Sequence, residues 1–473
     1  MTLVNRKLGS TGLARPILNG LVALYLVAAP LVAAASGGMS YWPAMSASER
    51  PIGVKEQFEP VPMPPGFQIV VTEQEGPVFA DARGHTLYTW PVHQLRNGPV
   101  GERKGQPSCD KTVYTVNAGL MSPYPGGFEL PEVATRPSCV DVWPPVIAAD
   151  DAKPVGTKWT IAQRKDGQRQ WAYDGYALYT SVLDRQPGEV NGAISGATGE
   201  VGVRRPAAAP SMVPPQFKVA TRLTGRGLTT IDNYSVYASS KDQPDKSNCV
   251  GECLDDWKPI VAPAYAKPRG EFGVIERSPG IYQWTFRKQP LYTHDGEPFN
   301  KMYGSDVPGW FNVYTQYTPK PPADFTVQES PTGFVLGDKN GKTVYVYMCA
   351  DDALDQLACD HPDSPQIYRF TVCGGGDPKR CLERFPYVLA PKDAKTDNPV
   401  WSAMWIDPMT GKQAKPDQRG VLHVWAYRAR PVYTHYRDKA PGDMTADQWG
   451  EFYGYRNGYK AFWLRSDFGG RGE

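Results

Sequence analysis

The sequence predicts an all-β fold: three tandem β-rich units with disulfides and little helix beyond an N-terminal signal segment. The composition is rich in turn and strand formers, with 47 glycines, 46 prolines and 26 tyrosines among 473 residues. Such a composition is typical of short strands joined by tight turns. In addition, four blocks of residues recur three times in the same order, which is typical of a repeat protein. Eight cysteines complete the pattern.

The charge balance excludes one class of function. Lysine and arginine number 51 and the acidic residues 49, a net charge of +2. A nucleic-acid-binding protein usually carries a basic excess on at least one element, so we expect no nucleic-acid partner. The length suffices for about three domains.

Residues 1–36 have the pattern of a signal peptide. Three basic residues precede an uncharged run, 17–35, which ends in three alanines at Ala35. We expect cleavage near Ala35 and export to the periplasm or out of the cell. The alternative is an uncleaved N-terminal membrane anchor, because the run approaches the ~20 residues of a membrane span. Residues 37–63 would then form a linker, and no transmembrane span is expected after signal cleavage.

The first repeated block marks the start of each unit. A proline pair and an aromatic residue occupy 64–67, 214–217 and 321–325. The predicted units are therefore 64–213, which contains a long insertion, 214–320 and 321–473. In the first and third units a polar Gly-containing turn follows, which predicts a β-hairpin.

The last repeated block is an aromatic pair with constant spacing. A tryptophan precedes a tyrosine by eight residues in the pairs Trp171 and Tyr179, Trp284 and Tyr292, and Trp425 and Tyr433. Alternating aromatic residues around a polar turn predict a hairpin with one buried face, the tryptophan on one strand and the tyrosine on its partner. The aromatic ladder could instead bind carbohydrate. Identical spacing favours core packing, because each unit must bury the same face.

A tyrosine followed five residues later by an acid also recurs. The pairs are Tyr179 with Asp184, Tyr237 with Asp242, and Tyr433 with Asp438, whereas Tyr88 has His93 and Tyr292 has Glu297 at the acid position. Over roughly 64–466 the chain resembles a bacterial family of secreted repeats of unknown function, also described as predicted lipoproteins with a Tyr-x-(Phe/Trp/Tyr)-x-x-Asp motif. The middle aromatic of that motif is kept only after Tyr88, as Trp90, and is replaced by serine or histidine after the other tyrosines. No cysteine lies directly after the apolar run, the first being Cys109, so the family's lipid anchor does not carry over. The resemblance implies an all-β cell-envelope protein and brings no established chemistry.

The cysteines predict disulfides, since paired thiols persist in an oxidising compartment. There is no CxxC or CxxCH, which disfavours a thioredoxin-like site and c-type haem. Alignment of the units makes Cys139, Cys253 and Cys381 equivalent. The predicted bonds are Cys109–Cys139, Cys249–Cys253 and Cys359–Cys381, with Cys349–Cys373 as an extra pair.

Two groups of polar residues are candidate ligands. His294 and His435 occupy the same position in their units and could bind a metal or act in acid–base chemistry. They lack companion ligands, which favours polar residues on half-exposed strands. His361 is a weaker metal candidate on a loop. The acids at the motif ends could bind calcium or sugar hydroxyls, although Asx-type turns are the simpler interpretation.

No motif for a nucleophile elbow, a phosphate loop or a metalloprotease is present. The sequence therefore predicts a non-catalytic binding or structural module of the cell envelope with an unknown ligand or protein partner. The alternative is a periplasmic metal- or redox-associated protein that uses His294 and His435. A hydrolase has no positive support. No cofactor is predicted, apart from the transition metal of that alternative.

Overall fold

The computed structural model describes residues 53–95, 98–112, 117–118, 128–129, 137–192, 204–299, 301–349, 367–451 and 457–466. The chain divides into two compact units, Met1–Met39 and Ser40–Glu473, and all described residues lie in the second. The predicted signal segment lies outside the described residues. Among those described, no helix is long and apolar enough to cross a membrane.

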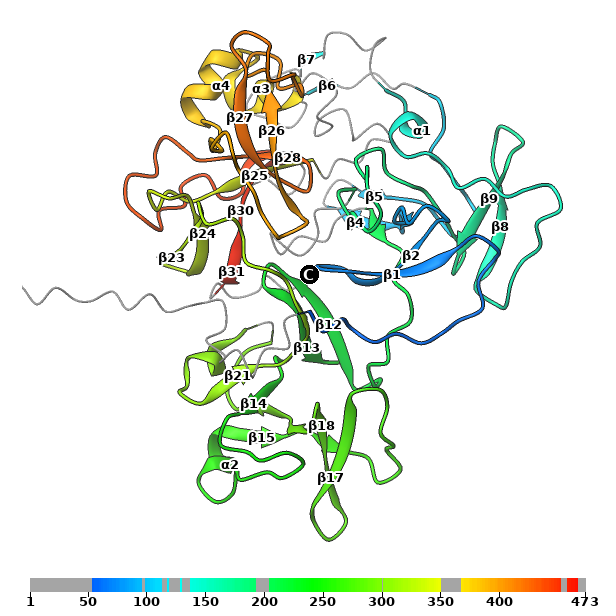
Figure 1. Ribbon diagram of the computed structural model, residues 1–473, viewed down its shortest axis with the longest axis vertical. Helices are drawn as coiled ribbons and strands as arrows, with labels where there is room; N and C mark the ends of the chain where they lie inside the picture. Colours follow the sequence, from blue (N-terminus) through cyan, green and yellow to red (C-terminus); the bar gives the residue numbers. More distant parts are fainter. Residues whose placement is uncertain are drawn as a thin grey trace, which may run out of the picture. The chain divides into compact units, whose positions relative to one another are not determined.

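The fold is built mostly from β-strands in several sheets, with few helices, as predicted (Figure 1). We call residues 64–213, 214–320 and 321–473 the first, second and third segments. Each segment opens with an antiparallel hairpin: β1 (Gln68–Thr72) with β2 (Gly76–Ala80), β12 (Phe217–Arg222) with β13 (Gly225–Thr230), and β23 (Thr326–Ser330) with β24 (Gly333–Gly337). The turn after β2 is fixed by Asp81, whose Oδ1 accepts the N–H groups of Arg83 and His85, each at 2.9 Å. Such turns explain why Asp and Gly cluster there.

A second hairpin in each segment carries the repeated tryptophan. Its strands are β8 (Trp159–Gln163), β9 (Arg169–Tyr173) and β10 (Tyr176–Ala177) in the first segment, β17 (Phe272–Ser278), β18 (Ile281–Phe286) and β19 (Gln289–Pro290) in the second, and β26 (Trp401–Ile406), β27 (Leu422–Tyr427) and β28 (Arg430–Tyr433) in the third. The first turn residue has φ 46° in all three, at Asp174, Arg287 and Arg428. Positive φ at both turn positions matches the right-handed twist of the strands.

In the first two segments the repeated tyrosine does not lie where the sequence predicts, whereas Tyr433 lies on β28, the partner strand of the Trp425 strand β27, as predicted. Only two residues after the turn pair with the tryptophan strand, for example Gln289 and Pro290 with β18. In the first two segments the chain then crosses to another sheet, whereas β28 pairs with both β27 and β25 in one sheet. In all three segments the tyrosine faces a tyrosine from the start of its segment. These partners are Tyr88 with Tyr179, Tyr237 with Tyr292, and Tyr345 with Tyr433. Local alternation predicts a strand but not which sheet its continuation joins, hence the error.

The remaining elements complete the sheets around these tyrosines. The strands are β3 (Tyr88–Thr89), β4 (His93–Leu95), β5 (Gly98–Val100), β6 (Asn117–Ala118), β7 (Phe128–Glu129), β11 (Arg205–Pro206), β14 (Tyr237–Ser239), β15 (Trp257–Pro259), β16 (Val261–Ala262), β20 (Tyr292–His294), β21 (Trp310–Asn312), β22 (Tyr314–Tyr317), β25 (Tyr345–Cys349), β29 (Trp449–Glu451), β30 (Asn457–Ala461) and β31 (Trp463–Ser466). The helices are α1 (Cys139–Val142), α2 (Cys253–Asp256), α3 (Ile367–Gly374), α4 (Pro378–Arg384) and the 3₁₀ turn η2 (Tyr303–Asp306). An aromatic residue caps α1, α2 and α4, and in each its N–H donates to the helix cysteine carbonyl.

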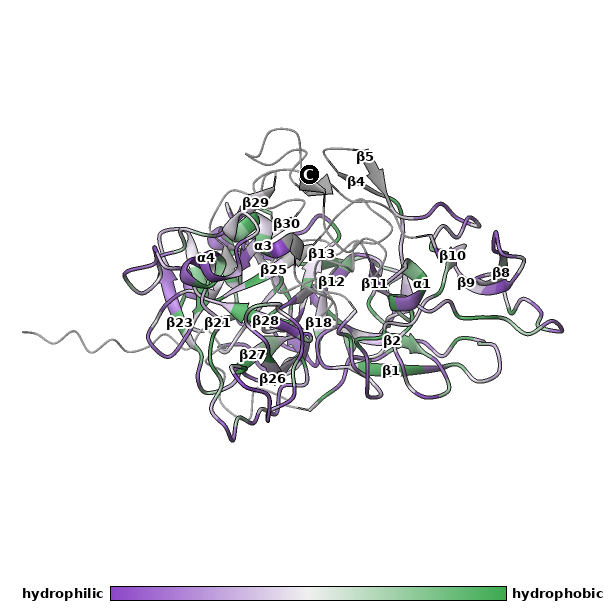
Figure 2. Cartoon of the chain, turned by 90° about the horizontal axis from the view of Figure 1, so that it is seen from above, coloured by the Kyte–Doolittle hydropathy of each residue, from purple (hydrophilic) through white to green (hydrophobic). Residues whose placement is uncertain are grey.

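The repeated tryptophans lie in the core. Trp171, Trp284 and Trp425 expose only 7, 3 and 2% of their surface. Figure 2 shows hydrophobic residues along β1 and β2, the hairpin that packs toward the first of these tryptophans. The cluster around Trp425 also includes Val190 and Leu223, from the first and second segments. The cores of the segments are therefore continuous.

The turn between β1 and β2 joins the segments through polar contacts. Gln74 Oε1 accepts the Tyr427 hydroxyl at 2.7 Å, and Arg428 Nη2 lies 2.6 Å from Glu75 Oε1. On the second segment, Gln316 Nε2 donates to the carbonyl oxygens of Thr72 and Glu73, both at 2.7 Å. Because Arg428 is fully buried, the Arg428–Glu75 ion pair lies at an interface between segments from which water is excluded.

Substituting any one of Trp171, Trp284 and Trp425 by alanine should lower the free energy of unfolding by roughly 3–5 kcal/mol, because a large buried side chain leaves a cavity. Thermal and urea unfolding of the three variants measures the loss. Tyr265→Ala is the control, since Tyr265 is 84% exposed. Three melting curves as unchanged as that of the control would contradict the core assignment.

Candidate functional site

The acid of the Tyr-x-x-x-x-acid motif is buried and bonded within its own segment. Asp184 is 6% exposed, and its Oδ2 accepts the hydroxyl of Tyr88 at 2.7 Å. Its Oδ1 accepts the backbone N–H of Asn191 at 2.7 Å. The carboxylate therefore ties strand β3 to the loop that follows the motif, in place of the exposed turn that the sequence favours.

The same arrangement occurs in the other two segments. Tyr237 donates to Glu297 at 2.7 and 2.9 Å, and Tyr345 donates to Asp438 at 2.8 Å. The backbone donors are Gly304 for Glu297 and Thr445 for Asp438, each at 2.9 Å. In all three segments this donor lies seven residues after the acid. The acid thus closes a loop of fixed length.

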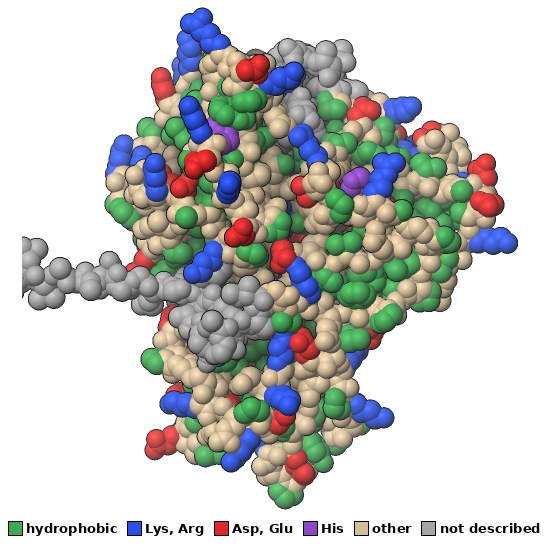
Figure 3. Space-filling model, in the orientation of Figure 1, with side chains coloured by type: hydrophobic (Ala, Val, Ile, Leu, Met, Phe, Trp, Pro, Cys, Tyr) green, Lys and Arg blue, Asp and Glu red, His purple; other side chains and the backbone are tan. Residues whose placement is uncertain are grey.

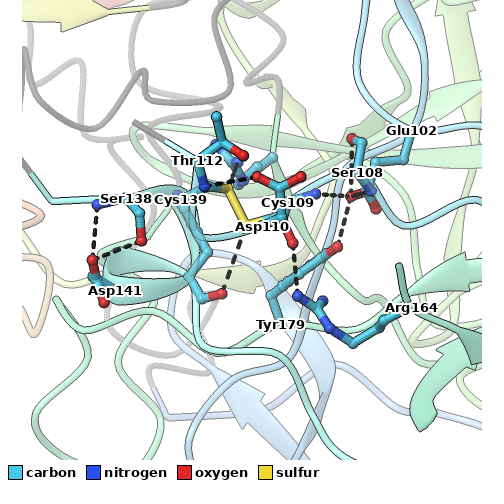
Figure 4. Close-up of a disulfide and its surroundings, with 12 residues drawn as sticks. Glu102, Ser108, Cys109, Asp110, Thr112, Ser138, Cys139, Asp141, Arg164 and Tyr179 are labelled. Atoms are coloured by element: carbon cyan, nitrogen blue, oxygen red, sulfur yellow. Dashed lines mark hydrogen bonds between the residues drawn. A yellow bond between two sulfur atoms is a disulfide. The ribbon is translucent and has the colours of Figure 1, made fainter. Parts of the chain in front are cut away.

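A second set of bonds runs crosswise in the first two segments. Tyr179 donates to Glu102 Oε1 at 2.6 Å, and that oxygen also accepts the N–H groups of Ser108 at 2.7 Å and Cys109 at 3.1 Å (Figure 4). Tyr292 donates to Asp242 at 2.8 Å. The tyrosine and the acid of one motif therefore bond to those of the other motif in the segment, not to each other.

Glu102 is the residue that the sequence analysis missed. The motif spacing from Tyr88 leads to His93, on β4, because an insertion separates the tyrosine from its acid. A signal was present nonetheless: Glu102 and Asp242 both precede the first cysteine of their segment by seven residues. That spacing reflects the carboxylate contacts to the chain just before the disulfide.

Two disulfides are those that the repeat alignment predicts, and one differs. Cys109 is bonded to Cys139 and Cys249 to Cys253, whereas Cys381 is bonded to Cys373. The predicted bonds Cys359–Cys381 and Cys349–Cys373 are therefore wrong. The reason is that α3 and α4 pack against each other and bring together cysteines eight residues apart. Cys359 lies outside the described residues.

Arginines support the cysteine loops of the first two segments. Arg164 donates to the carbonyl of Cys109 at 2.9 Å and to Gln170 at 2.7 Å. Arg277 makes the equivalent contacts, both at 2.7 Å. Figure 4 shows the contact between Arg164 and Cys109 on one side of the disulfide and the Ser138–Asp141 pair at the start of α1 on the other. These contacts join the cysteine loops to the tryptophan hairpins, which carry Gln170 and Gln283.

The third segment replaces the second carboxylate by an arginine. The guanidinium of Arg369 lies 4.9 Å from the ring centre of Tyr433, and its Nη2 donates to the Tyr387 hydroxyl at 2.8 Å. Among the described residues, no carboxylate accepts the Tyr433 hydroxyl.

The two candidate histidines pack on aromatic rings. His294 lies 4.7 Å from the Trp257 ring, with Nδ1 4.0 Å from Glu297. His435 lies 4.7 Å from the Phe385 ring, and its Nδ1 contacts Thr445 Oγ1 at 2.8 Å. Burial lowers the pKa of His435 to about 4. The described part of the chain holds no group of three or more His, Cys, Asp and Glu residues arranged to hold a metal. His361 lies outside that part.

Burial raises the pKa values of the motif acids. Desolvation raises the pKa of Asp184 to about 7, and it also raises the pKa values of Glu297 and Asp438. Tyr88 and Tyr345, which donate to Asp184 and Asp438, have pKa values well above 10 for the same reason. The tyrosines are therefore fixed donors. An acid that is buried and bonded in this way holds the loops together.

A family model described as a secreted repeat of unknown function matches residues 160–201. This stretch of the chain is similar to that family. It contains β9, β10, Tyr179 and Asp184, which are the tryptophan hairpin and the motif with its buried acid. No curated protein and no solved structure matches the chain.

The raised pKa of Asp184 predicts a pH-dependent stability. A carboxyl group with a folded pKa of about 7 and an unfolded pKa near 3.8 stabilises the fold below pH ~4, and this contribution is lost as the pH rises through 7. Three pKa units correspond to roughly 4 kcal/mol at most. Urea unfolding at pH 5 and pH 8 should therefore show a smaller pH difference for Asp184→Asn than for the wild type.

Asp232→Asn is the control, because Asp232 is exposed. Glu297 and Asp438 titrate in the same direction, so part of the pH dependence should remain in Asp184→Asn. An identical pH dependence in wild type and Asp184→Asn would show that Asp184 does not titrate in this range.

Proposed function

We propose that this protein is an exported, non-catalytic module of the cell envelope, in which three tandem units form one rigid scaffold that binds an envelope ligand or protein. The observation that carries the proposal is the recurring tyrosine–carboxylate hydrogen bond. The motif tyrosines and acids, which resemble functional groups in the sequence, are buried and bonded to each other within the fold. Export is supported by the N-terminal signal pattern and by the similarity of residues 160–201 to secreted repeats.

The recurrence of contacts supports the three-unit organisation. The opening hairpin, the capped cysteine helix, the tryptophan hairpin and the buried acid with its donor seven residues later occur once in each segment. A unit that repeats down to individual hydrogen bonds is explained by duplication of one folding pattern.

The contacts between segments support a rigid scaffold. Val190 and Leu223 enter the hydrophobic core of the third segment, and the Glu75–Arg428 pair is buried. Separating the two partners of a buried ion pair leaves an uncompensated buried charge, which strongly destabilises the protein. Movement between the segments that would separate Glu75 from Arg428 is therefore restricted. On the face shown in Figure 3, side chains of both charges are interspersed, as suits recognition without a single-sign field.

The proposal is tested by co-sedimentation of the purified exported protein with isolated peptidoglycan and with envelope membranes, with elemental analysis of the same samples. We expect retention in one fraction, unchanged by a chelator. The His294→Ala/His435→Ala variant should have the same metal content as the wild type. His294→Ala alone is the control for folding, because His435 is buried whereas the His294 side chain is 24% exposed.

Copper, zinc or iron that is present in the wild type and lost in the double variant would favour the metal-associated alternative. Retention in neither fraction, in a folded sample, would contradict the binding module.

A further inference from the structure

The third segment contains a buried guanidinium beside a disulfide. Arg369 is fully buried, and its Nη1 lies 3.3 Å from Cys381 Sγ. The guanidinium also bonds to the side chains of Tyr387 and Tyr459 and packs on the rings of Phe370, Tyr387 and Tyr433, and among the described residues its Nε has no hydrogen-bond acceptor. Within the described residues no ion pair joins Arg369 to a carboxylate. In the described part of the chain, this arginine therefore carries a positive charge in a low-dielectric site with no carboxylate as counter-ion.

The disulfide is the group that could supply the missing negative charge. A neutral disulfide sulfur is a weak hydrogen-bond acceptor, whereas a thiolate at the same position would form an ion pair with the guanidinium. A neighbouring arginine lowers the pKa of a thiol, and stabilisation of the reduced form makes a disulfide more oxidising. Reduction would therefore relieve the unpaired charge of Arg369.

We propose that Cys373–Cys381 is a redox-active disulfide whose substrate is a dithiol, and that Arg369 is the positioning residue that stabilises the Cys381 thiolate. A thiolate of the dithiol attacks Cys373 Sγ, the S–S bond breaks, and its electron pair leaves on Cys381 Sγ. The second thiol of the reductant then attacks the mixed disulfide and releases Cys373, which takes one proton. The dithiol is oxidised to a disulfide, and its other proton goes to solvent.

The chain next to Cys373 offers a route for the attack. Both cysteines are buried, but Cys373 lies one residue before the end of α3, and the following turn at 375–377 is exposed. Gly375 and Gly376 have φ values of 67° and 90° there. Local opening at such a turn exposes Cys373 without unfolding the sheets.

In the first segment, too, a guanidinium approaches a disulfide sulfur, whereas in the second it does not. Arg204 Nη2 lies 3.3 Å from Cys139 Sγ, the cysteine equivalent to Cys381. In the second segment, Arg277 contacts the Cys249 carbonyl oxygen instead. The chain thus provides internal controls, since each arginine should affect only its own disulfide.

The test is redox equilibration of the full exported chain with dithiothreitol buffers, followed by differential alkylation and mass spectrometry of each cysteine peptide. Arg369→Met should make Cys373–Cys381 at least tenfold harder to reduce, a shift of about 30 mV for a two-electron couple. Arg369→Lys retains the charge and should stay close to the wild type. Cys249–Cys253 should be unchanged in both variants, and Arg204→Met should shift Cys109–Cys139 alone.

Folding of each variant is checked by near-UV circular dichroism. If Arg369→Met does not fold, Arg369→Gln gives the same comparison, because its amide can still bond to Tyr387. Equal equilibrium constants in wild type and the uncharged variant would overturn the proposal. So would a shift of all three disulfides together, which would report general loss of stability.

Discussion

The structure depends on burying a carboxylate in each segment. An ionised carboxylate removed from water is costly unless hydrogen-bond donors replace the water. Here a tyrosine hydroxyl and a backbone N–H supply them, and the tyrosine comes from 96, 60 or 93 residues away in the chain. Because the two halves of the bond lie at opposite ends of a segment, satisfying the acid requires the whole segment to be folded. The motif residues therefore contribute to the stability of the folded segment.

The first two segments each contain a second buried tyrosine–carboxylate bond. In the first two segments the last tyrosine bonds to an acid that precedes the cysteine loop, so the disulfide and the carboxylate fix the same stretch of chain. In the third segment, α3 provides Arg369, and the tyrosines surround a cation. Where the first two segments have a carboxylate, the third has the guanidinium of Arg369, which lies next to Cys381 Sγ. The redox proposal follows from this difference.

The sequence predicts the features that depend on local pattern. Alternating aromatics around polar turns indicate the hairpins, and constant spacing indicates that Trp171 and its equivalents are buried. The sequence does not predict the features that depend on contacts between residues far apart in the chain. The sheet that Tyr292 joins depends on its pairing with a distant strand. An insertion between Tyr88 and Glu102 changes the motif spacing. The disulfide partner of Cys381 depends on the packing of α3 against α4. The spacing predicts turn residues at the acids, because it carries no information about a hydrogen-bond donor far away in the chain.

The most direct measurement of the central claim is a double-mutant cycle on Tyr345 and Asp438, with Tyr345→Phe, Asp438→Asn and the double variant compared by urea unfolding. A buried hydrogen bond to a charged group predicts a coupling free energy of about 1.5–3 kcal/mol. Tyr345→Phe combined with Asp232→Asn, a substitution in the second segment, should show effects that add to within about 0.5 kcal/mol. Additive effects of Tyr345→Phe and Asp438→Asn as well would contradict the claim that this bond holds the segment together.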